Sequence, residues 1–416
     1  MPDKKINQIK LILFTALLGG SAGAVVWCFL KAVSFLTGVI WETLPQKSGL
    51  SFLPVLVCAL GGLCVGVMHK KYGNYPEELA VVMKKIKEDK YYEYKHMTAM
   101  LLCALIPLVL CSSVGPEAGL TGIIAALCYW VGDNVSFARG YTGELSEISE
   151  AVTLGQIFRS PLFGILAVEK LEDENRPEKM QKRDKLLYYG ISTASGFFIV
   201  RILNTVFGKA MEGFPSFSDA PSGAMDYALL LLYIPVGLLL FILFEAFEKL
   251  TKKLGGHTPV ILKELLCGIV IGLTGLFLPM VMGSGEEQMA ELMETFAAYT
   301  PLFLAAICIL KLLMTAFCIN FGMKGGHFFP LIFACTCMGF TLSILIFPEA
   351  GSHAAFASAA VTATVLGAQL KKPFAAAFLL LLCFPAELLL WSFLCAAAGS
   401  KAAALIEGKI PGGVAK

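Results

Sequence analysis

Long apolar runs recur along the chain and are separated by short polar stretches. Each run is long enough, or nearly long enough, to cross the hydrocarbon core of a bilayer, about 30 Å thick, as a helix. Because there are many of them, we expect an all-α polytopic membrane protein rather than a soluble domain with one anchor. Such runs include 11–36, 52–67, 100–110, 229–244, 302–317 and 374–393.

Other apolar segments are too short or too interrupted to span a bilayer alone. They are 79–83, 119–131, 152–171 and 357–370. Broken helices are tolerated at membrane depth only where their exposed backbone lies inside the protein or lines a cavity. Transporters place such helices in paired repeats around a site near the midplane. The pattern therefore predicts broken and tilted helices around an internal site.

Short segments also repeat in the same order about half a chain apart. Residues 154–161 read Leu-Gly-Gln-Ile-Phe-Arg-Ser-Pro, and 366–373 read Leu-Gly-Ala-Gln-Leu-Lys-Lys-Pro. Two further pairs, 73–79 with 283–289 and 113–116 with 326–330, keep nearly the same offset, which indicates an internal repeat. We expect a first membrane repeat at 1–210, a polar connecting segment at 211–226, a second membrane repeat at 227–400, and a last helix with the C-terminal tail at 401–416.

Composition supports a membrane protein and excludes other classes. Of the residues, 57% are hydrophobic and only 15% are charged, whereas soluble domains carry about 25% charge. The net charge is +2, and no basic block is interleaved with aromatic residues, so we expect no nucleic-acid partner. Lys4, Lys5 and Lys10 precede the first apolar run. They predict a cytoplasmic N-terminus in the cell membrane.

The sequence offers little for catalysis or for a metal. The 13 cysteines are scattered through apolar stretches, without partners at metal-ligand spacing, so we expect no metal and no cofactor. Ser112, Ser113, Ser284 and His353 belong to no recognised nucleophile-base motif. We therefore do not expect an enzyme.

Three turns, at 73–76, 112–116 and 325–330, share one design. Small residues are followed by a proline near the first helical position and then by an apolar helix. Proline suits this position because the amide that it lacks would be unpaired there. The remaining first-turn amides and the helix dipole favour an anion. Partial charges let an ion leave as well as enter, so the turns predict an anion pathway; ordinary helix starts are the alternative.

The same turns match a known set of three anion-pathway motifs, GSGIP, GREGP and GGxFxP. Residues 325–330 read Gly-Gly-His-Phe-Phe-Pro and match the third motif in full. Residues 112–116 keep the Gly-Pro end of the second, residues 72–76 keep the proline of the first, and 159–166 resemble the stretch NAPLAGxLF. The chain thus resembles the CLC family of chloride channels and chloride/proton antiporters. This resemblance implies two inverted repeats and a homodimer with one pore per subunit.

The chain departs from the family at positions that matter for mechanism. In proton-coupled relatives the glutamate of GREGP gates the pathway and carries the proton, and here Val114 stands in its place. Leu171 stands where the exchangers carry an inner proton-transfer glutamate, with Glu169 and Glu172 nearby. The chain ends at Lys416, so we expect no cytoplasmic nucleotide-binding domain. The resemblance with these departures implies passive, proton-uncoupled conduction of chloride.

The resemblance also implies the residues of the anion site. Gly73 replaces the serine of GSGIP, with Asn74 as a substitute donor, and Ala404 replaces a tyrosine of the last helix. Backbone amides of the second and third turns would supply most of the coordination. The expected anion-binding set is Gly73, Asn74, Ser113, Val114, Gly115, His327, Phe328, Phe329 and Ala404.

Two titratable residues leave an alternative open. Glu117 directly follows the Gly-Pro turn and would serve as a displaced gate in a chloride/proton or fluoride/proton antiporter, so both Val114 and Glu117 are gating candidates. The other interpretation of Glu117 is an acidic residue that stabilises a first helical turn. The His327 side chain would tune conduction between about pH 5 and 8. Proton movement tied to chloride is the discriminating observation.

Overall fold

The computed structural model describes residues 2–89, 91–135, 141–168, 182–210, 213–220 and 222–408. Within these ranges the chain is almost entirely helical and contains no β-strand, only an isolated bridge between Gly115 and Gly326. Nine of the described helices are long and apolar enough to cross a membrane. The prediction of an all-α polytopic membrane protein is confirmed.

The first half of the chain combines long helices with very short ones. α4 and α8 are too short to span a bilayer, as the interrupted apolar segments predict. A π-helical turn, Val39–Thr43, follows α1, and another, Lys85–Asp89, follows α4. The helices are α1 (Pro2–Gly38), α2 (Leu44–Ser48), α3 (Leu53–Tyr72), α4 (Leu79–Lys84), α5 (Met97–Val109), α6 (Glu117–Asn134), α7 (Thr142–Ile157), α8 (Pro161–Val168) and α9 (Lys182–Phe207).

The second half follows the same order after a short entry helix. Single 3₁₀ turns, Pro279–Val281, Phe296–Ala298 and Ala386–Leu388, precede α13, α14 and α18. The helices are α10 (Ala224–Ala228), α11 (Leu230–Gly256), α12 (Val260–Phe277), α13 (Glu286–Thr295), α14 (Pro301–Asn320), α15 (Phe328–Ile346), α16 (Ala350–Leu370), α17 (Pro373–Leu380) and α18 (Leu389–Gly408).

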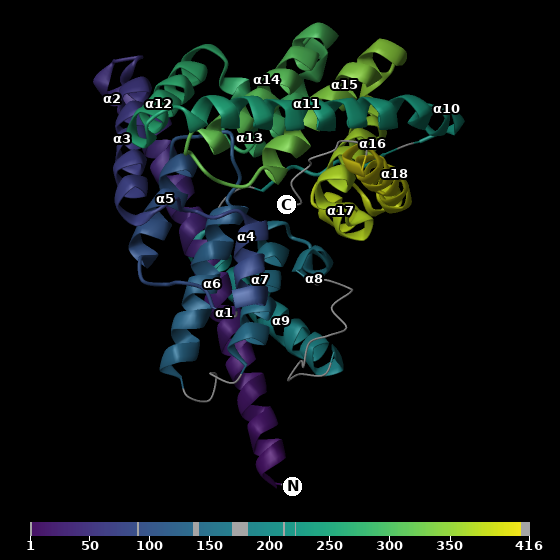
Figure 1. The fold of residues 1–416 in the computed structure, drawn as a ribbon. Helices are drawn as coiled ribbons and strands as arrows, with labels where there is room; N and C mark the ends of the chain where they lie inside the picture. Colours follow the sequence, from purple (N-terminus) through teal and green to yellow (C-terminus); the bar gives the residue numbers. More distant parts are fainter. Residues whose placement is uncertain are drawn as a thin grey trace.

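The two halves are inverted repeats of one design. α1 packs on α7 and α9, and α11 packs on α16 and α18 in the same way. α7 and α16 are each followed by a residue with positive φ, Arg159 at 47° and Lys371 at 52°, and the next helix begins at a proline. Non-glycine residues rarely adopt this conformation, so its recurrence marks equivalent positions. In Figure 1 the first half lies below and to the left, and the halves meet where α3 packs on α12.

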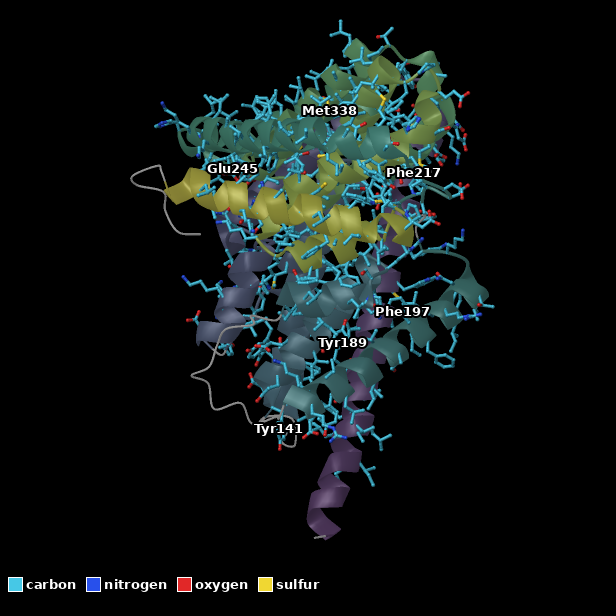
Figure 2. The ribbon with its side chains drawn as sticks, turned by 90° about the vertical axis from the view of Figure 1, so that its right-hand side faces the viewer. Tyr141, Tyr189, Phe197, Phe217, Glu245 and Met338 are labelled. Carbon is cyan, nitrogen blue, oxygen red and sulfur yellow. The ribbon has the colours of Figure 1, made fainter. Side chains whose placement is uncertain are left out.

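The segment between the repeats packs on the second half. The Phe217 amide donates to the Cys383 carbonyl at 2.9 Å, and the Phe217 ring stacks on Phe384 (Figure 2). Residues 211, 212 and 221 of the expected connecting segment lie outside the described residues. The boundary expected between 400 and 401 falls inside α18, so no separate last helix begins there, and 409–416 are not described.

Glycines allow α3 and α12 to approach closely. A Cβ added at Gly62 would lie 2.2 Å from the Glu264 carbonyl oxygen, and one at Gly268 would lie 2.1 Å from the Cys58 carbonyl oxygen. Small residues at such crossings let helix backbones pack together inside a membrane. The close contact between the two repeats therefore requires glycine at these positions, because any side chain would collide with the backbone of the opposite helix.

Replacing Gly268 by alanine is expected to destabilise the protein by about 1–3 kcal/mol, because the new methyl group meets backbone that cannot yield locally. The matched control is Gly190→Ala on α9, where an added Cβ has open space. The two variants are compared by heating each in detergent and measuring, by size-exclusion chromatography, how much folded protein remains at each temperature. An equally stable Gly268→Ala protein would contradict the close α3–α12 contact.

Candidate functional site

Two helix starts, one from each repeat, meet inside the protein. The turn after α5 leads into α6 at Glu117, and the turn after α14 leads into α15 at Phe328. The Gly115 amide donates to the Gly326 carbonyl at 2.7 Å, and the Gly326 amide donates to the Gly115 carbonyl at 2.8 Å. This antiparallel bridge joins the turns 112–116 and 325–330. The two turns that the motifs single out therefore form one site.

The Glu117 carboxylate occupies the start of α15. Its Oε1 accepts a hydrogen bond from the Phe328 amide at 3.1 Å, and its own backbone amide also faces the carboxylate. The side chain is 1% exposed, and Oε2 has no hydrogen-bond partner among the described residues. A free first-turn amide is the group that binds an anion at a helix N-terminus. Glu117 thus supplies a tethered anion at that amide.

Glycines at the bridge make room for this carboxylate. A Cβ at Gly326 would lie 1.8 Å from Cδ of Glu117, and one at Gly115 would lie 2.1 Å from Oε2. No side chain fits at either position without moving the carboxylate. The glycines of the two turns therefore serve a second purpose besides the tight turn, which is to hold Glu117 between the repeats.

Other groups of the second turn are already engaged within the protein. The Val114 amide donates to the Ser112 carbonyl at 2.7 Å, and the Ser113 hydroxyl is hydrogen-bonded to the Thr315 hydroxyl at 2.8 Å. The Val114 side chain is fully buried and packs against Gly325. The Gly115 amide is used in the bridge, so both amides are engaged within the protein, and anion coordination by Val114 and Gly115 stays a prediction. In this structure these donors stabilise the turn.

The third turn matches the expected set more closely. Phe328 and Phe329 are buried, and the Phe158 ring lies 6.1 Å from Phe328 and 4.9 Å from Phe329, between ring centroids. The half-buried His327 ring stands 4.7 Å from Phe328 and 6.0 Å from Phe244. Aromatic side chains therefore surround the first turn of α15. In this turn the Phe328 amide is hydrogen-bonded to the Glu117 carboxylate.

The first expected turn is arranged differently. Gly73 and Asn74 are exposed, and α4 begins at Leu79, so Pro76 stands before the first helical turn rather than in it. The Nε2 atom of His69 is hydrogen-bonded to the Tyr75 carbonyl, which ties this turn to α3. Pro76 was expected to mark the helix start, but the residue directly before α4 is Glu78, in an extended conformation.

Ala404 also differs from its expected place. It lies on α18, the second-repeat counterpart of α9, and its side chain is exposed. The alignment to a family tyrosine assumed an additional last helix, whereas the described chain ends in α18. Glu169, Leu171 and Glu172, the candidates for inner proton transfer, lie outside the described residues.

Sequence reasoning passed over two charged residues in apolar helices. Glu264 on α12 is fully buried and 2.7 Å from Nδ1 of His69 on α3, so it links the repeats. Lys311 on α14 is fully buried and donates to the carbonyls of residues 281, 282 and 283 at 3.0, 2.7 and 2.7 Å. Ionisable residues are costly within a membrane and mark polar contacts there. Their isolation in apolar runs was the available signal.

Nothing in the described part of the chain indicates a metal centre. No group of three or more histidine, cysteine, aspartate or glutamate side chains lies close enough to hold an ion. The described site offers a ligand the backbone amide of Phe328 at the start of α15. The Glu117 carboxylate must give up its hydrogen bond to this amide before a ligand can take its place. This arrangement suits reversible anion binding.

Comparisons with solved structures show the same fold. One solved structure, described as a slow cyanobacterial Cl⁻/H⁺ antiporter, matches with a TM-score of 0.80 at 14% identity, over 96% of this chain and 95% of the other. Another, a CLC-type fluoride/proton antiporter, matches with a TM-score of 0.73 at 17% identity, over 95% of both chains. A eukaryotic CLC transporter gives 0.69 at 17% identity, covering 95% of this chain and 72% of the other.

Sequence comparison extends over the same region. The Uncharacterized protein MJ0305 of Methanocaldococcus jannaschii is 24% identical over 394 residues, which cover 91% of this chain and 89% of that protein. The family model described as Voltage gated chloride channel matches residues 61–404. That range includes both bridged turns and most of both repeats. The chain therefore belongs to the voltage-gated chloride channel family, the CLC family.

Proposed function

We propose that the protein exchanges chloride or a similar small anion for protons across the cell membrane, with Glu117 as the gate. The observation that carries this proposal is the hydrogen bond from the Phe328 amide to the Glu117 carboxylate. An anion that needs this amide competes with the carboxylate for it. Protonation removes the negative charge of Glu117, which weakens its hold on the amide and lets an anion replace it.

The register of the second motif supports this assignment. Residues 115–119 read Gly-Pro-Glu-Ala-Gly, and they place Glu117 at the centre of a five-residue segment, as the glutamate stands in GREGP. Gly115 then pairs with Gly326 of the third motif, consistent with two repeat-related turns. In this register the chain keeps its gating glutamate, and Val114 precedes the motif. The structures it resembles include proteins described as Cl⁻/H⁺ and fluoride/proton antiporters.

Passive chloride conduction, the function implied by the register with Val114, is the second candidate. The observation that favours it is the Leu171 found where the exchangers carry an inner proton-transfer glutamate. A pathway that Glu117 opens and closes without net proton transfer would also be compatible with the site. Membership of the CLC family supports anion transport and is compatible with both coupled exchange and passive conduction.

Simultaneous flux measurements separate the two candidates. Purified protein in chloride-loaded proteoliposomes is monitored with a chloride electrode and a pH electrode while valinomycin clamps the potential. Coupled exchange predicts proton movement in a fixed ratio to chloride. Chloride efflux without proton movement would refute coupling and leave passive conduction. Substituting fluoride, bromide or nitrate for chloride then ranks the anions.

The wild-type anion flux is expected to rise as the pH falls, because protonation neutralises the carboxylate that competes for the Phe328 amide. Glu286 at the start of α13 is a charged neighbour of Glu117, and its negative charge also favours the protonated form of Glu117. Initial chloride flux measured at a series of symmetric pH values tests this. A flux that is constant or that falls on acidification would contradict gating by Glu117.

We also propose a homodimer and a cytoplasmic N-terminus. Apolar side chains are exposed on helices of both repeats, including Phe198 and Val206 on α9 and Leu390 and Leu405 on α18. A second copy or lipid would cover such surfaces. Lys4, Lys5 and Lys10 support the orientation. Chemical crosslinking in membranes and labelling of an N-terminal cysteine test the two points separately.

A further inference from the structure

A second buried carboxylate lies away from the bridged turns. Glu150 on α7 is 0% exposed, and neither of its carboxylate oxygens has a hydrogen-bond partner among the described residues. The backbone of Ala125 on α6 lies near the Glu150 carboxylate but does not form a hydrogen bond of good geometry with it. An unpaired buried carboxylate is costly in any protein interior, and inside a membrane it indicates a functional site. The gate at Glu117 does not account for it.

Polar groups lead from the surface to Glu150. The Tyr92 side chain is 2% exposed. Its ring lies 5.8 Å from the Lys85 ammonium that pairs with Glu77, and Glu150 is close enough for its charge to act on the Tyr92 hydroxyl. Glu77 is 20% exposed and forms an ion pair with Lys85 through one carboxylate oxygen. Its other oxygen and the Tyr92 hydroxyl have no hydrogen-bond partner among the described residues. Buried polar atoms of this kind are ordinarily bridged by ordered water, so Glu77, Tyr92 and Glu150 outline a hydrated route.

The other groups around Glu150 are neutral in their ordinary form. Cys128 and Tyr129 of α6 are close enough for the Glu150 charge to act on them, and no ion pair joins Glu150 to a charged group among the described residues. Glu147 points elsewhere, to Lys185 at 2.6 Å. No cation therefore compensates the Glu150 carboxylate within the described structure. A proton is the simplest counter-charge that this site accepts.

The route runs along the helix that begins with the gate. Ala125 is eight residues beyond Glu117, roughly 12 Å along α6 at 1.5 Å per residue. Between them, the Thr121 hydroxyl donates to the Glu117 carbonyl at 3.0 Å, and a Cβ at Gly122 would lie 3.2 Å from the Tyr92 hydroxyl. α4, α6 and α7 lie together in this part of the fold (Figure 1). The Tyr92 hydroxyl thus lies against α6 about one turn before Ala125, the residue whose backbone lies near Glu150.

We propose that Glu150 holds a transported proton on its way to or from Glu117, and that Tyr92 and Glu77 supply it. Glu77 accepts a proton from solvent. The Tyr92 hydroxyl gives its own proton to the Glu150 carboxylate through water and takes the proton of Glu77 through water, so Tyr92, Glu77 and the waters end unchanged and one proton has moved from solvent to Glu150. No bond other than O–H breaks or forms. This inference rests on the proposed anion/proton exchange and names the residues of its proton route.

The test compares Glu150→Gln and Tyr92→Phe with the wild type in the simultaneous chloride and proton assay. Proton flux is expected to fall at least about tenfold in both variants, as for loss of a positioned proton-transfer group, while chloride flux stays within about twofold. Glu147→Gln is the matched control on the same helix and is expected to keep both fluxes. Tyr92→Phe keeps the ring, so it carries the test if Glu150→Gln does not fold.

A second readout detects the proton itself. Infrared difference spectra between acid and alkaline buffer are expected to contain a carboxyl C=O band that disappears in Glu150→Gln and persists in Glu147→Gln. A wild type that couples, with unchanged proton flux in both variants, would overturn this inference alone. Equal loss of chloride and proton flux in both variants would also overturn it, as a structural role. A wild type without proton flux would overturn the proposed exchange and this inference together.

Discussion

Glu117→Gln is expected to abolish proton exchange and leave anion flux that no longer depends on pH. Glutamine keeps the size of the side chain but neither binds a proton in this range nor carries the negative charge that competes for the Phe328 amide. Proton flux should fall at least about tenfold, the scale of losing a positioned proton-transfer group. The simultaneous chloride and proton assay measures both effects.

The control for this variant is Glu147→Gln, which removes a partly exposed, ion-paired carboxylate on a neighbouring helix. It should retain the wild-type ratio of protons to anions. Persistence of pH-dependent exchange in Glu117→Gln would mean that another group gates the pathway. Glu286 would then be the next residue to replace, because it is the charged neighbour of Glu117.

Gly326→Ala is expected to disrupt the site through space rather than charge. The added methyl carbon would lie 1.8 Å from Cδ of Glu117, so the carboxylate must leave the Phe328 amide. Overpacking of this kind costs about 1–3 kcal/mol of stability, and the proton-to-anion ratio should fall as in Glu117→Gln. Thermal unfolding and the flux assay report the two consequences.

A double variant separates this clash from a general effect on the turn. Glu117→Ala removes the atoms that the new methyl group meets, so Gly326→Ala should be less destabilising in that background than alone. Gly143→Ala, at a helix start with open space around the glycine, controls for loss of glycine itself. Additive effects of Gly326→Ala and Glu117→Ala would contradict a shared space.

The fold was predictable because bilayer physics restricts it. Long apolar runs specify crossings, and segments such as 152–171, too interrupted for one crossing, appear as the separate helices α7 and α8. The Leu-Gly to proline repeat corresponds to the ends of α7 and α16, where Arg159 and Lys371 adopt the same unusual backbone. The helix boundary expected at 400 was wrong, because the alanine-rich sequence around it favours continuation of a helix, and α18 runs through it.

The site was predictable in part. The third motif is intact in the sequence, and its Phe328 amide does meet a carboxylate. The second motif keeps only small residues and a proline, and these fit a helix start in more than one register. Aligning its Gly-Pro end put Val114 in the place of the gating glutamate and left Glu117 as a displaced gate. The carboxylate that reaches Phe328 belongs to Glu117. Pairings across the repeats, such as Gly115 with Gly326, depend on tertiary structure and have no local signal.

Glu150 and Tyr92 were missed for a related reason. A single glutamate in a moderately polar helix such as α7 resembles a surface residue, and only packing shows that it is 0% exposed. Its neighbours come from α6 and from the segment before α5, which no spacing rule connects. Burial of a charge is a property of the whole fold rather than of the sequence around it.

A bromide ion should bind at the Phe328 amide once the Glu117 carboxylate no longer occupies it. Crystals of Glu117→Gln grown in bromide test this by anomalous diffraction, since bromide can stand in for chloride and is located by its own scattering. We predict a bromide within hydrogen-bond distance of the Phe328 amide in the variant, and none there in the wild type at alkaline pH. Bromide bound at that amide beside an ionised wild-type Glu117, or absent from it in the variant, would contradict competition between the carboxylate and the anion.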